Sequence, residues 1–395
     1  SRACFMSGMY TPRHGIFTVS PPDRGDRTKR KLIPIPNVED LRKDIPTMGE
    51  LFKRNGYRCG HVGKWHLGDD EDGTGPLSRG FDVNVAGGRA GTPYSYYYPY
   101  CNNKGMCHIG LEKGKQGEYL TDRLTDEAVA FIKESAHGEK PFFLYLAHHA
   151  VHTPITAPQS IVDKYEKKAK GKYHTNSVYA AMVETLDNSV GKICGIIDSL
   201  GISDNTIIIF NSDNGGSEPI TDNYTVRGGK GMPYEGGNRV PLIVKWPNVA
   251  KAGKISDCPV NNIDFFSTFQ MYLEGKIGDE LDGTDIYPLL NNEKSSIERD
   301  LFWHFPAYLE SYTDNGKGFR AKPYTSVRSG KWKLIYYYEN ENTELFDLDK
   351  DPLEEHDLSC VNEEMVSILK KKIFSWIERV NAPVPTKLNP YYEGD

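Results

Sequence analysis

Three helix-periodic segments, each followed by a short apolar run, constrain the fold of this sequence more than any other feature. Thr47 and Glu50 have the spacing of a capping box and predict a helix over residues 47–55. Apolar residues that recur every three or four positions predict two longer helices, over residues 120–134 and 179–200. The apolar runs that follow these helices are YRCGHV, PFFLYLAHH and NTIIIFNSDNGG, and a fourth run, VPLIVKWP, has no such helix before it. This alternation predicts an α/β fold with a mainly parallel central sheet sandwiched by helices.

The C-terminal part of the chain has a different pattern. The runs LFWHFP, SVRSGKWKLIYYY and TELFDL alternate as antiparallel strands do, and apolar residues return at helical spacing over residues 365–380. We therefore predict two domains, an α/β domain over residues 1–295 and a smaller α+β subdomain with an antiparallel sheet over residues 296–395. The boundary lies in the polar stretch NNEKSSIERD.

Composition and charge exclude several classes of protein. No run reaches the roughly 18 apolar residues of a membrane-spanning helix, so no transmembrane segment is expected in this chain. The formal net charge of −6 and the absence of a basic stripe argue against nucleic acid as a partner. The seven cysteines contain no C-x-x-C pair, which disfavours a zinc cage or a redox pair. Cys101 and Cys107 are spaced to close a small disulfide loop if the compartment is oxidising.

Polar and charged residues gather where the predicted strands end. Ligands of open α/β sheets bind outside the carboxyl ends of the strands, so these side chains are expected to converge. The residues are Lys64, His66, His148, His149, His152, Asn211, Asp213 and Asn214. The glycine-rich segment RGGKGMPYEGGNR, before the fourth run, adds Lys230 and Arg239. Lysines, histidines and a pair of oxygen ligands suit a doubly oxygenated anion held beside a hard cation.

Each of these residue types also has an ordinary structural explanation. A lysine beside a glycine, such as Lys64, is often a solvated turn residue, and internal hydrogen bonds explain His148 and His149 as well. Two adjacent oxygen ligands, Asp213 and Asn214, favour Ca²⁺, and less strongly Mg²⁺, over zinc. The acidic run Asp69 to Asp72 is expected to be a solvated loop, because it lacks the alternating spacing of a calcium loop.

Two segments resemble the signatures of the type I, formylglycine-dependent sulfatases of the alkaline-phosphatase-like superfamily. The second family signature is similar to GYRCGHVGKWHLG, and the end of the first is similar to SRACFMSGMYTPRHG. The segments HHAVHTP, NSDNGG, GKGMPYEGGNRVP and VRSGKWKLIYY extend the resemblance over nearly the whole chain. It implies an alkaline-phosphatase-like fold, in which residues 1–295 form the catalytic domain, and the hydrolysis of a sulfuric ester.

The resemblance implies a role for each matched residue at the reacting end of the substrate. Arg2 matches the arginine that steadies the nucleophile, and Lys64 matches the lysine that contacts both nucleophile and sulfate. His66 matches the histidine that handles the proton of the nucleophile. In the family this nucleophile is a hydrated formylglycine, which the formylglycine-generating enzyme makes from a Cys or a Ser. It is expected upstream of Ser1, with two metal-ligating aspartates, so the chain is expected to be N-terminally truncated and inactive by itself.

The other matched residues are implied to bind the sulfate, the metal and the leaving group. His152 matches the histidine that faces the leaving-group oxygen, and Lys230 matches a second sulfate-binding lysine. Asp213 and Asn214 match two of the calcium ligands. The lysines and the cation would stabilise the sulfate oxygens as the S–O bond breaks, and the two histidines would divide acid and base catalysis between them.

Aromatic residues suggest a sulfated carbohydrate as the substrate. The stretches AGGRAGTPYSYYYPYC and FWHFPAY, the latter with His304, offer rings that suit sugar faces, unless the tyrosines only pack a long loop. We expect Arg239 and His304 to contact the substrate, with a structural role as the alternative for Arg239. Likeness to bacterial carbohydrate sulfatases favours a galactose or N-acetylgalactosamine sulfate, besides aryl sulfates, and implies a periplasmic or secreted protein. The alternatives are a phosphodiesterase or phosphonate-ester hydrolase of the same superfamily, and a sulfated-glycan-binding pseudoenzyme.

Overall fold

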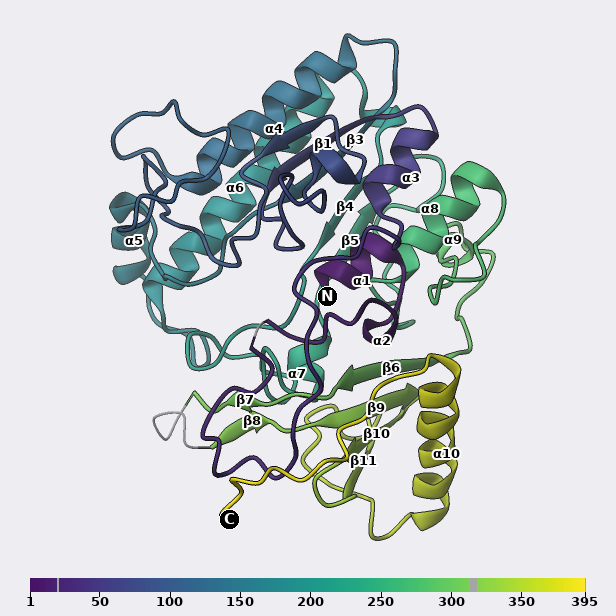
Figure 1. Cartoon of the computed structure of the whole chain (residues 1–395). Helices are drawn as coiled ribbons and strands as arrows, with labels where there is room; N and C mark the ends of the chain where they lie inside the picture. Colours follow the sequence, from purple (N-terminus) through teal and green to yellow (C-terminus); the bar gives the residue numbers. More distant parts are fainter. Residues whose placement is uncertain (20, 313–317, 395) are drawn as a thin grey trace.

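The computed structural model describes residues 1–19, 21–312 and 318–394, and Figure 1 shows an α/β unit above an antiparallel-sheet unit. The α/β unit contains a parallel sheet with the strand order β2–β1–β3. Its strands are β1 (Arg58–Gly63), β2 (Val83–Val85) and β3 (Phe142–Ala147). The main helices around it are α3 (Met48–Arg54), α4 (Leu120–Ala136), α6 (Ser177–Ser199) and α8 (Asp264–Glu274).

Helices cover both faces of the parallel sheet, and the side chains of β3 show this most directly. Phe143 and Tyr145 pack into the hydrophobic cluster formed with α3 and α8. Leu144 and Leu146 pack into a second cluster, formed with α4 and α6. Successive side chains of a strand point to opposite faces, so each face of the sheet has its own core. The predicted α/β class, with a parallel sheet between helices, is confirmed.

The third and fourth apolar runs do not extend this parallel sheet. β4 (Ile208–Asn211) and β5 (Leu242–Lys245) form an antiparallel pair of their own. A parallel partner needs a crossover connection, usually through a long helix, but the described connection from β4 to β5 contains only the short α7 (Glu235–Asn238). Among the described residues, the sheet that contains the third and fourth runs is therefore a separate antiparallel pair, and only the first two runs lie in the parallel sheet.

The C-terminal unit is an antiparallel sheet covered by one helix. Its strand order is β11–β10–β9–β6, and α10 (Glu363–Arg379) packs on β9 and β10. The strands are β6 (Asp300–Phe305), β9 (Tyr324–Ser329), β10 (Trp332–Tyr337) and β11 (Thr343–Asp347). Phe302, Leu334 and Trp376 lie in the core between sheet and helix. The predicted antiparallel sheet at the C-terminal end is confirmed.

The N-terminal segment contacts both units. The remaining elements are α1 (Arg2–Ser7), α2 (Thr11–His14), α5 (Gln159–Glu166), α9 (Tyr287–Leu290), the 3₁₀ turns η1 (Leu77–Arg79) and η2 (Ser203–Asn205), and the strand pair β7 (Leu309–Glu310) and β8 (Phe319–Ala321). After α2 the chain runs along the C-terminal unit, where Asp23 pairs with Tyr308 and Leu32 pairs with Leu388. The two units are therefore joined by more than the connection near residue 295.

Local predictions agree with the structure. Thr47 caps α3, because its hydroxyl accepts from the N–H of Glu50 while its own N–H donates to the Glu50 carboxylate. Cys101 and Cys107 form a disulfide. Among the described residues, no helix is both long and apolar enough to cross a membrane.

Candidate active site

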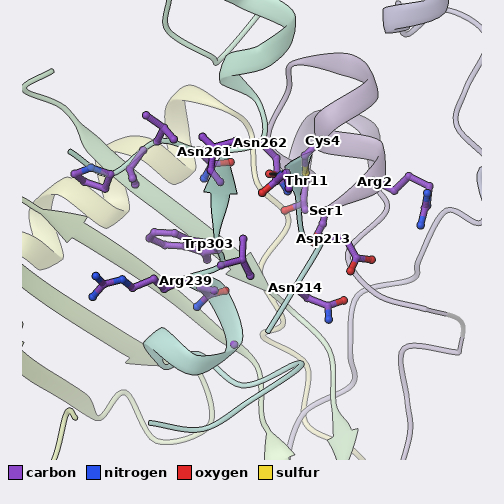
Figure 2. A pocket seen from close by; sticks show the side chains of 18 of the residues that line it. Ser1, Arg2, Cys4, Thr11, Asp213, Asn214, Arg239, Asn261, Asn262 and Trp303 are labelled. Carbon is purple, nitrogen blue, oxygen red and sulfur yellow. Dashed lines mark hydrogen bonds between the residues drawn. The ribbon is translucent and has the colours of Figure 1, made fainter. Parts of the chain in front are cut away.

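A cavity of about 1320 Å³ lies between the two units, at the carboxyl ends of β1 and β4. The sequence-predicted residues that line it are Arg2, Lys64, His66, Asn211, Asp213, Asn214, Lys230, Arg239 and His304. Among the described residues, the predicted His148, His149 and His152 do not line it. Figure 2 shows Asp213 and Asn214 side by side, with Arg2 on one side of them and Arg239 on the other. The structure thus brings most of the predicted site residues to one edge of the α/β unit.

Backbone contacts place Lys64 where β1 ends. Gly63 has a φ of +105°, and a Cβ there would lie 2.1 Å from the carbonyl oxygen of Ala147, so the position requires glycine. This close approach lets the N–H of Lys64 donate to the Ala147 carbonyl at 2.7 Å. Arg2 donates through Nη1 to the carbonyl of Lys64 at 2.9 Å and to the hydroxyl of Tyr145 at 3.1 Å. Helix α1 is thereby tied to β3 and to the end of β1.

The site contains more positive than negative charge. Burial, together with the charges of Arg2 and Lys230, lowers the pKa of Lys64 to about 7. Burial also lowers the pKa of Lys230, and the carboxylate of Asp213 opposes that change. Burial alone would raise the pKa of Asp213, but the three cations outweigh burial and hold that pKa below its usual value. One carboxylate faces three cations, which favours the binding of an anion.

Two histidines accompany these charges. His66 has a positive φ of 57° and packs its ring against Gly91. Burial and the charge of Lys64 lower the pKa of His66 to about 4, so its ring is neutral near pH 7 and can accept a proton. Nδ1 of His152 donates to the carbonyl of Thr153 at 2.9 Å, which leaves Nε2 for a proton or a substrate atom. The pair has the chemistry that acid and base catalysis requires.

A tyrosine of the tyrosine-rich stretch holds the segment of His149 and His152 in place. The hydroxyl of Tyr96 shares its proton between the carbonyls of His149 and His152, at 2.9 and 2.8 Å. Tyr96 and Tyr100 are both buried. For these two rings the structure favours the packing alternative over a sugar-binding surface.

Asp213 and Asn214 offer oxygen ligands directly after β4. The side-chain nitrogen of Asn214 donates to the carbonyl of Gly215 at 2.9 Å, so the amide oxygen is left to bind a cation. Carboxylate and amide oxygens are the ligands that Ca²⁺ and Mg²⁺ prefer in proteins. The donor chemistry fits a hard cation, and these two residues would supply two of the roughly six to eight ligands that calcium takes.

A buried ion cluster holds the glycine-rich segment that carries Lys230. The N–H of Lys230 donates to the carbonyl of Gly216 at 2.9 Å. Later in the segment, Glu235 pairs with Lys333 of β10 at 3.1 Å, and Lys333 also pairs with Glu354 at 2.9 Å. Because the side chains of Lys333 and Glu354 are 0% exposed, water does not screen this pair. The C-terminal unit thereby fixes the segment of Lys230.

Arg239 and His304, which were predicted to contact the substrate, lie in different surroundings from the lysines of the site. Arg239 is exposed, and Figure 2 shows its side chain extending away from Asp213. His304 is buried, with Nδ1 at 2.7 Å from the hydroxyl of Thr325 and Nε2 at 3.0 Å from the carbonyl of Pro383. Because the protein engages both ring nitrogens, His304 joins three segments of the C-terminal unit. We therefore leave His304 out of the proposed substrate contacts.

The acidic run Asp69 to Asp72 lies in a loop whose ion-paired carboxylates are partly exposed to solvent, as expected. Arg89 pairs with Asp69 at 2.9 Å and also with Asp72. A third carboxylate, that of Asp40, lies 2.5 Å from the same guanidinium. These carboxylates hold a loop in place and are separate from the candidate metal ligands.

Comparisons with known proteins decide the family. Residues 1–274 match the family model described as Sulfatase. The chain belongs to the sulfatase family. Residues 229–381 match a second model, described as the C-terminal part of N-sulphoglucosamine sulphohydrolase. The first match includes every candidate residue of this sulfatase from Arg2 to Arg239.

The relatives of this sulfatase include carbohydrate sulfatases. A sulfatase of Formosa agariphila is 29% identical, over 97% of this chain and 79% of that protein. The N-acetylgalactosamine-6-sulfatase of Mus musculus is 30% identical, over 94% of this chain and 74% of that protein. The crystal structure of Ps i-CgsB in complex with k-i-k-neocarrahexaose has a TM-score of 0.76 at 29% identity, covering 95% of this chain and 81% of that chain.

An enzyme whose name refers to a different ester, a phosphonate, shares the fold. The phosphonate monoester hydrolase of Agrobacterium radiobacter has a TM-score of 0.65 at 16% identity, covering 96% of this chain and 86% of that chain. At this identity the likeness shows the fold alone. The choice between sulfate and phosphonate esters therefore depends on the family match and on the residues of the cavity.

Proposed function

We propose that this sulfatase hydrolyses a sulfate ester of a carbohydrate, with a formylglycine as the nucleophile and calcium as the cation. The observation that carries the proposal is the group of three cations, Arg2, Lys64 and Lys230, around the carboxylate of Asp213. A sulfate ester carries a negative charge that repels an anionic nucleophile, so its site must supply positive charge. Membership of the family makes sulfate the first choice among oxyanion esters.

Each residue has a distinct task in this proposal. Lys64 and Lys230 bind the sulfate oxygens and stabilise the charge that develops as the S–O bond breaks. His152 donates a proton through Nε2 to the leaving-group oxygen, and the neutral His66 accepts a proton from the attacking group. Burial and the two lysines lower the pKa of His152, and a bound sulfate would offset the lysine charges and help to keep that ring protonated.

Two groups would complete the site. Formylglycine would supply the attacking oxygen, and calcium, held by Asp213 and Asn214, would supply positive charge beside it. Arg2 orients Lys64 through its hydrogen bond to the Lys64 carbonyl. The formylglycine-generating enzyme would be the maturation partner, and the protein would work in the periplasm or outside the cell.

The proposed substrate is a galactose or N-acetylgalactosamine sulfate within a glycan. One relative is an N-acetylgalactosamine-6-sulfatase, and one similar structure contains k-i-k-neocarrahexaose. The cavity of about 1320 Å³ exceeds the roughly 300 to 1,000 Å³ of typical small-molecule sites. It therefore has room for more than one sugar unit.

The test compares the release of sulfate from N-acetylgalactosamine and galactose sulfates with the cleavage of an aryl sulfate and an aryl phosphodiester. The protein is produced from its full reading frame together with the formylglycine-generating enzyme. Lys64→Ala, Lys230→Ala and His152→Ala should each lower turnover about a hundredfold or more, as loss of one charge-stabilising group does. Lys140→Ala, at an exposed lysine before β3, is the control and should leave turnover unchanged.

The outcomes separate the alternatives. Faster cleavage of the phosphodiester than of every sulfate would replace the proposal by a phosphodiesterase. Binding of sulfated glycans without turnover would indicate a pseudoenzyme. Near-normal turnover in two of the three active-site variants would contradict the residue assignment. Removal of calcium by a chelator should abolish turnover, and Asp213→Ala should weaken the recovery when calcium is returned.

A further inference from the structure

A second group of cations lines the cavity on the side of the C-terminal unit. Arg320 of β8 and Arg24 of the N-terminal segment both border the cavity, as Lys230 does. A Cβ on Gly231, the residue after Lys230, would lie 3.3 Å from Nε of Arg320, so the guanidinium packs against the Lys230 segment. Burial lowers the pKa of Lys230, and the charges of Arg320 and Arg24 add to that change. These cations therefore interact along one wall of the cavity.

An aromatic ring holds Arg320 in place. The guanidinium carbon lies 3.8 Å above the ring centroid of Tyr312, a distance at which a cation is attracted to the ring face. The hydroxyl of Ser217 donates to the hydroxyl of Tyr312 at 2.8 Å. The residue before Ser217 is Gly216, whose carbonyl accepts a hydrogen bond from the N–H of Lys230. The ring beneath Arg320 is thus linked to the segment that positions Lys230.

The guanidinium of Arg320 has donors that the protein does not use. Its Nε is buried, and among the described residues it has neither a hydrogen-bond partner nor a carboxylate in a salt bridge. Arg24, by contrast, pairs with Glu310. Arg328, on the neighbouring β9, pairs with Glu235 at 3.1 Å. Glu310 attracts Arg320 but pairs with Arg24, so among the described residues Arg320 has no salt bridge of its own. A partly buried cation without a paired anion is unfavourable, and an anionic ligand in the cavity would relieve this cost.

We propose that Arg320 binds a second anionic group of the substrate, a sulfate or a carboxylate on the sugar next to the one whose sulfate ester is cleaved. The inference rests on the proposed function, since it takes Lys64 and Lys230 as the site of cleavage. A guanidinium presents its N–H donors in a fixed fork that matches the oxygens of an oxyanion. Because the cavity exceeds the size needed for one sugar, both anions fit within it. The substrate class is then a glycan with at least two anionic groups.

The test measures binding by isothermal titration calorimetry to protein produced without the formylglycine-generating enzyme, so that the nucleophile is not formed and the ligands are not cleaved. The ligands are a monosulfated N-acetylgalactosamine disaccharide, the same disaccharide with a second sulfate on the neighbouring sugar, and a monosulfated disaccharide with a uronate as the neighbour. Arg320→Gln should lower the affinity for the dianionic ligands about tenfold, the loss of one charge-assisted contact, and change the affinity for the monosulfated ligand less than about twofold. The two dianionic ligands show whether Arg320 prefers sulfate or carboxylate.

Two further variants control the experiment. Arg27→Gln is a matched control, because Arg27 stacks over Tyr391 at 3.6 Å but is exposed and is not among the residues that line the cavity. It should change none of the affinities. Arg320→Lys keeps the charge without the fork and should retain part of the preference for dianionic ligands. If Arg320→Gln does not fold in thermal unfolding, Arg320→Lys decides, and wild-type affinity in that variant would contradict the inference.

The remaining outcomes are equally informative. An equal loss of affinity for all three ligands in Arg320→Gln would overturn the inference, since Arg320 would then belong to the site of the cleaved sulfate. Unchanged affinity for every ligand would overturn it as well. Failure of the wild-type protein to bind any of the ligands would overturn the proposed function and this inference with it. A loss confined to the dianionic ligands supports the inference.

Discussion

Strands on the two sides of the cavity differ in how far they are enclosed. In the α/β unit, Ile243 of β5 is 64% exposed, and the residues of β3 and β4 are mostly half-buried. In the C-terminal unit, Ile335 of β10 is 0% exposed. Among the described residues, β3 and β4 each have one strand partner, whereas β9 and β10 each have two. An unpaired strand edge leaves backbone donors and acceptors open to solvent.

The difference matters because most of the candidate chemistry belongs to the less enclosed side. Lys64 and Asp213 follow β1 and β4, whereas Lys333 of the C-terminal unit holds the segment that carries Lys230. The enclosed sheet therefore acts as a support, and the loops of the more open side carry the reacting groups. Functional residues commonly lie on loops that a rigid scaffold positions.

The largest effect is expected from the buried cluster of Glu235, Lys333 and Glu354. Lys333→Met leaves Glu354 buried without a cation, because among the described residues Arg328 pairs with Glu235 and not with Glu354. Removing one partner of a buried ion pair costs about 3 to 5 kcal/mol. Urea unfolding at neutral pH should show a fall of that size in the free energy of unfolding.

An exposed lysine next to the same strand provides the control. Lys331 pairs with Asp347 at 2.8 Å, but its side chain is 39% exposed, so Lys331→Met should cost about 1 kcal/mol or less. Burial raises the pKa of Glu354 against the attraction of Lys333. Without Lys333 this pKa rises further, so the loss in Lys333→Met should shrink as the pH falls and the carboxyl is protonated. Equal losses in the two lysine variants would contradict the role of burial.

A matched pair of isoleucines compares the two sheets directly. Ile335→Ala removes a side chain that is 0% exposed and should lower the free energy of unfolding by about 2 to 5 kcal/mol. Ile243→Ala removes a side chain that is 64% exposed and should change it by no more than about 0.5 kcal/mol. Urea unfolding under identical conditions measures both. A similar loss in the two variants would mean that another surface covers β5 in solution, and the contrast between the sheets would disappear.

How much of the molecule could be predicted from sequence depends on how far apart the interacting residues are. The contact between Thr47 and Glu50 is local, so the start of α3 was predictable. Lys64 and the strand ends were predictable because ligand-binding residues gather at the carboxyl ends of α/β strands. Glu235 and Lys333 are 98 positions apart, and no local pattern marks either as the partner of the other. A lysine in a core position of a strand was the one signal, since buried lysines are rarely unpaired.

Other features depend on interactions that only the folded sheets determine. Aromatic neighbours suggested His304 as a substrate contact, and the structure places it at the cavity, but its nitrogens lie within hydrogen-bond distance of Thr325 and Pro383 from two other segments. The direction of β5 depends on the path of residues 212–241, which passes the cavity instead of forming a crossover helix. Arg320 was missed because a single arginine in a short strand is ordinary. Its significance appears only when the cavity is known.

A smaller effect is expected on anion binding, where Lys64 titrates near neutrality. Burial, with the charges of Arg2 and Lys230, lowers the pKa of Lys64 to about 7. Lys64 is charged below that pH and neutral above it, so the affinity for inorganic sulfate should fall about tenfold between about pH 6 and about pH 9. Calorimetric titration in calcium-free buffer measures this change. Lys64→Gln should remove most of it, and Arg2→Gln should move it to higher pH. A flat profile in the unmodified protein would contradict the assignment.

The smallest effect concerns Arg89, which faces several carboxylates as Lys333 does but differs in exposure. Arg89 pairs with Asp40, Asp69 and Asp72, and its side chain is 42% exposed, whereas that of Lys333 is 0% exposed. Water and salt screen exposed ion pairs, so Arg89→Gln should lower the free energy of unfolding by about 1 kcal/mol or less. Urea unfolding in about 1 M salt should remove most of this loss and leave the Lys333→Met loss nearly unchanged. A large, salt-independent loss in Arg89→Gln would show that the number of carboxylates matters more than burial, and both sides of the cavity would then be stabilised in the same way.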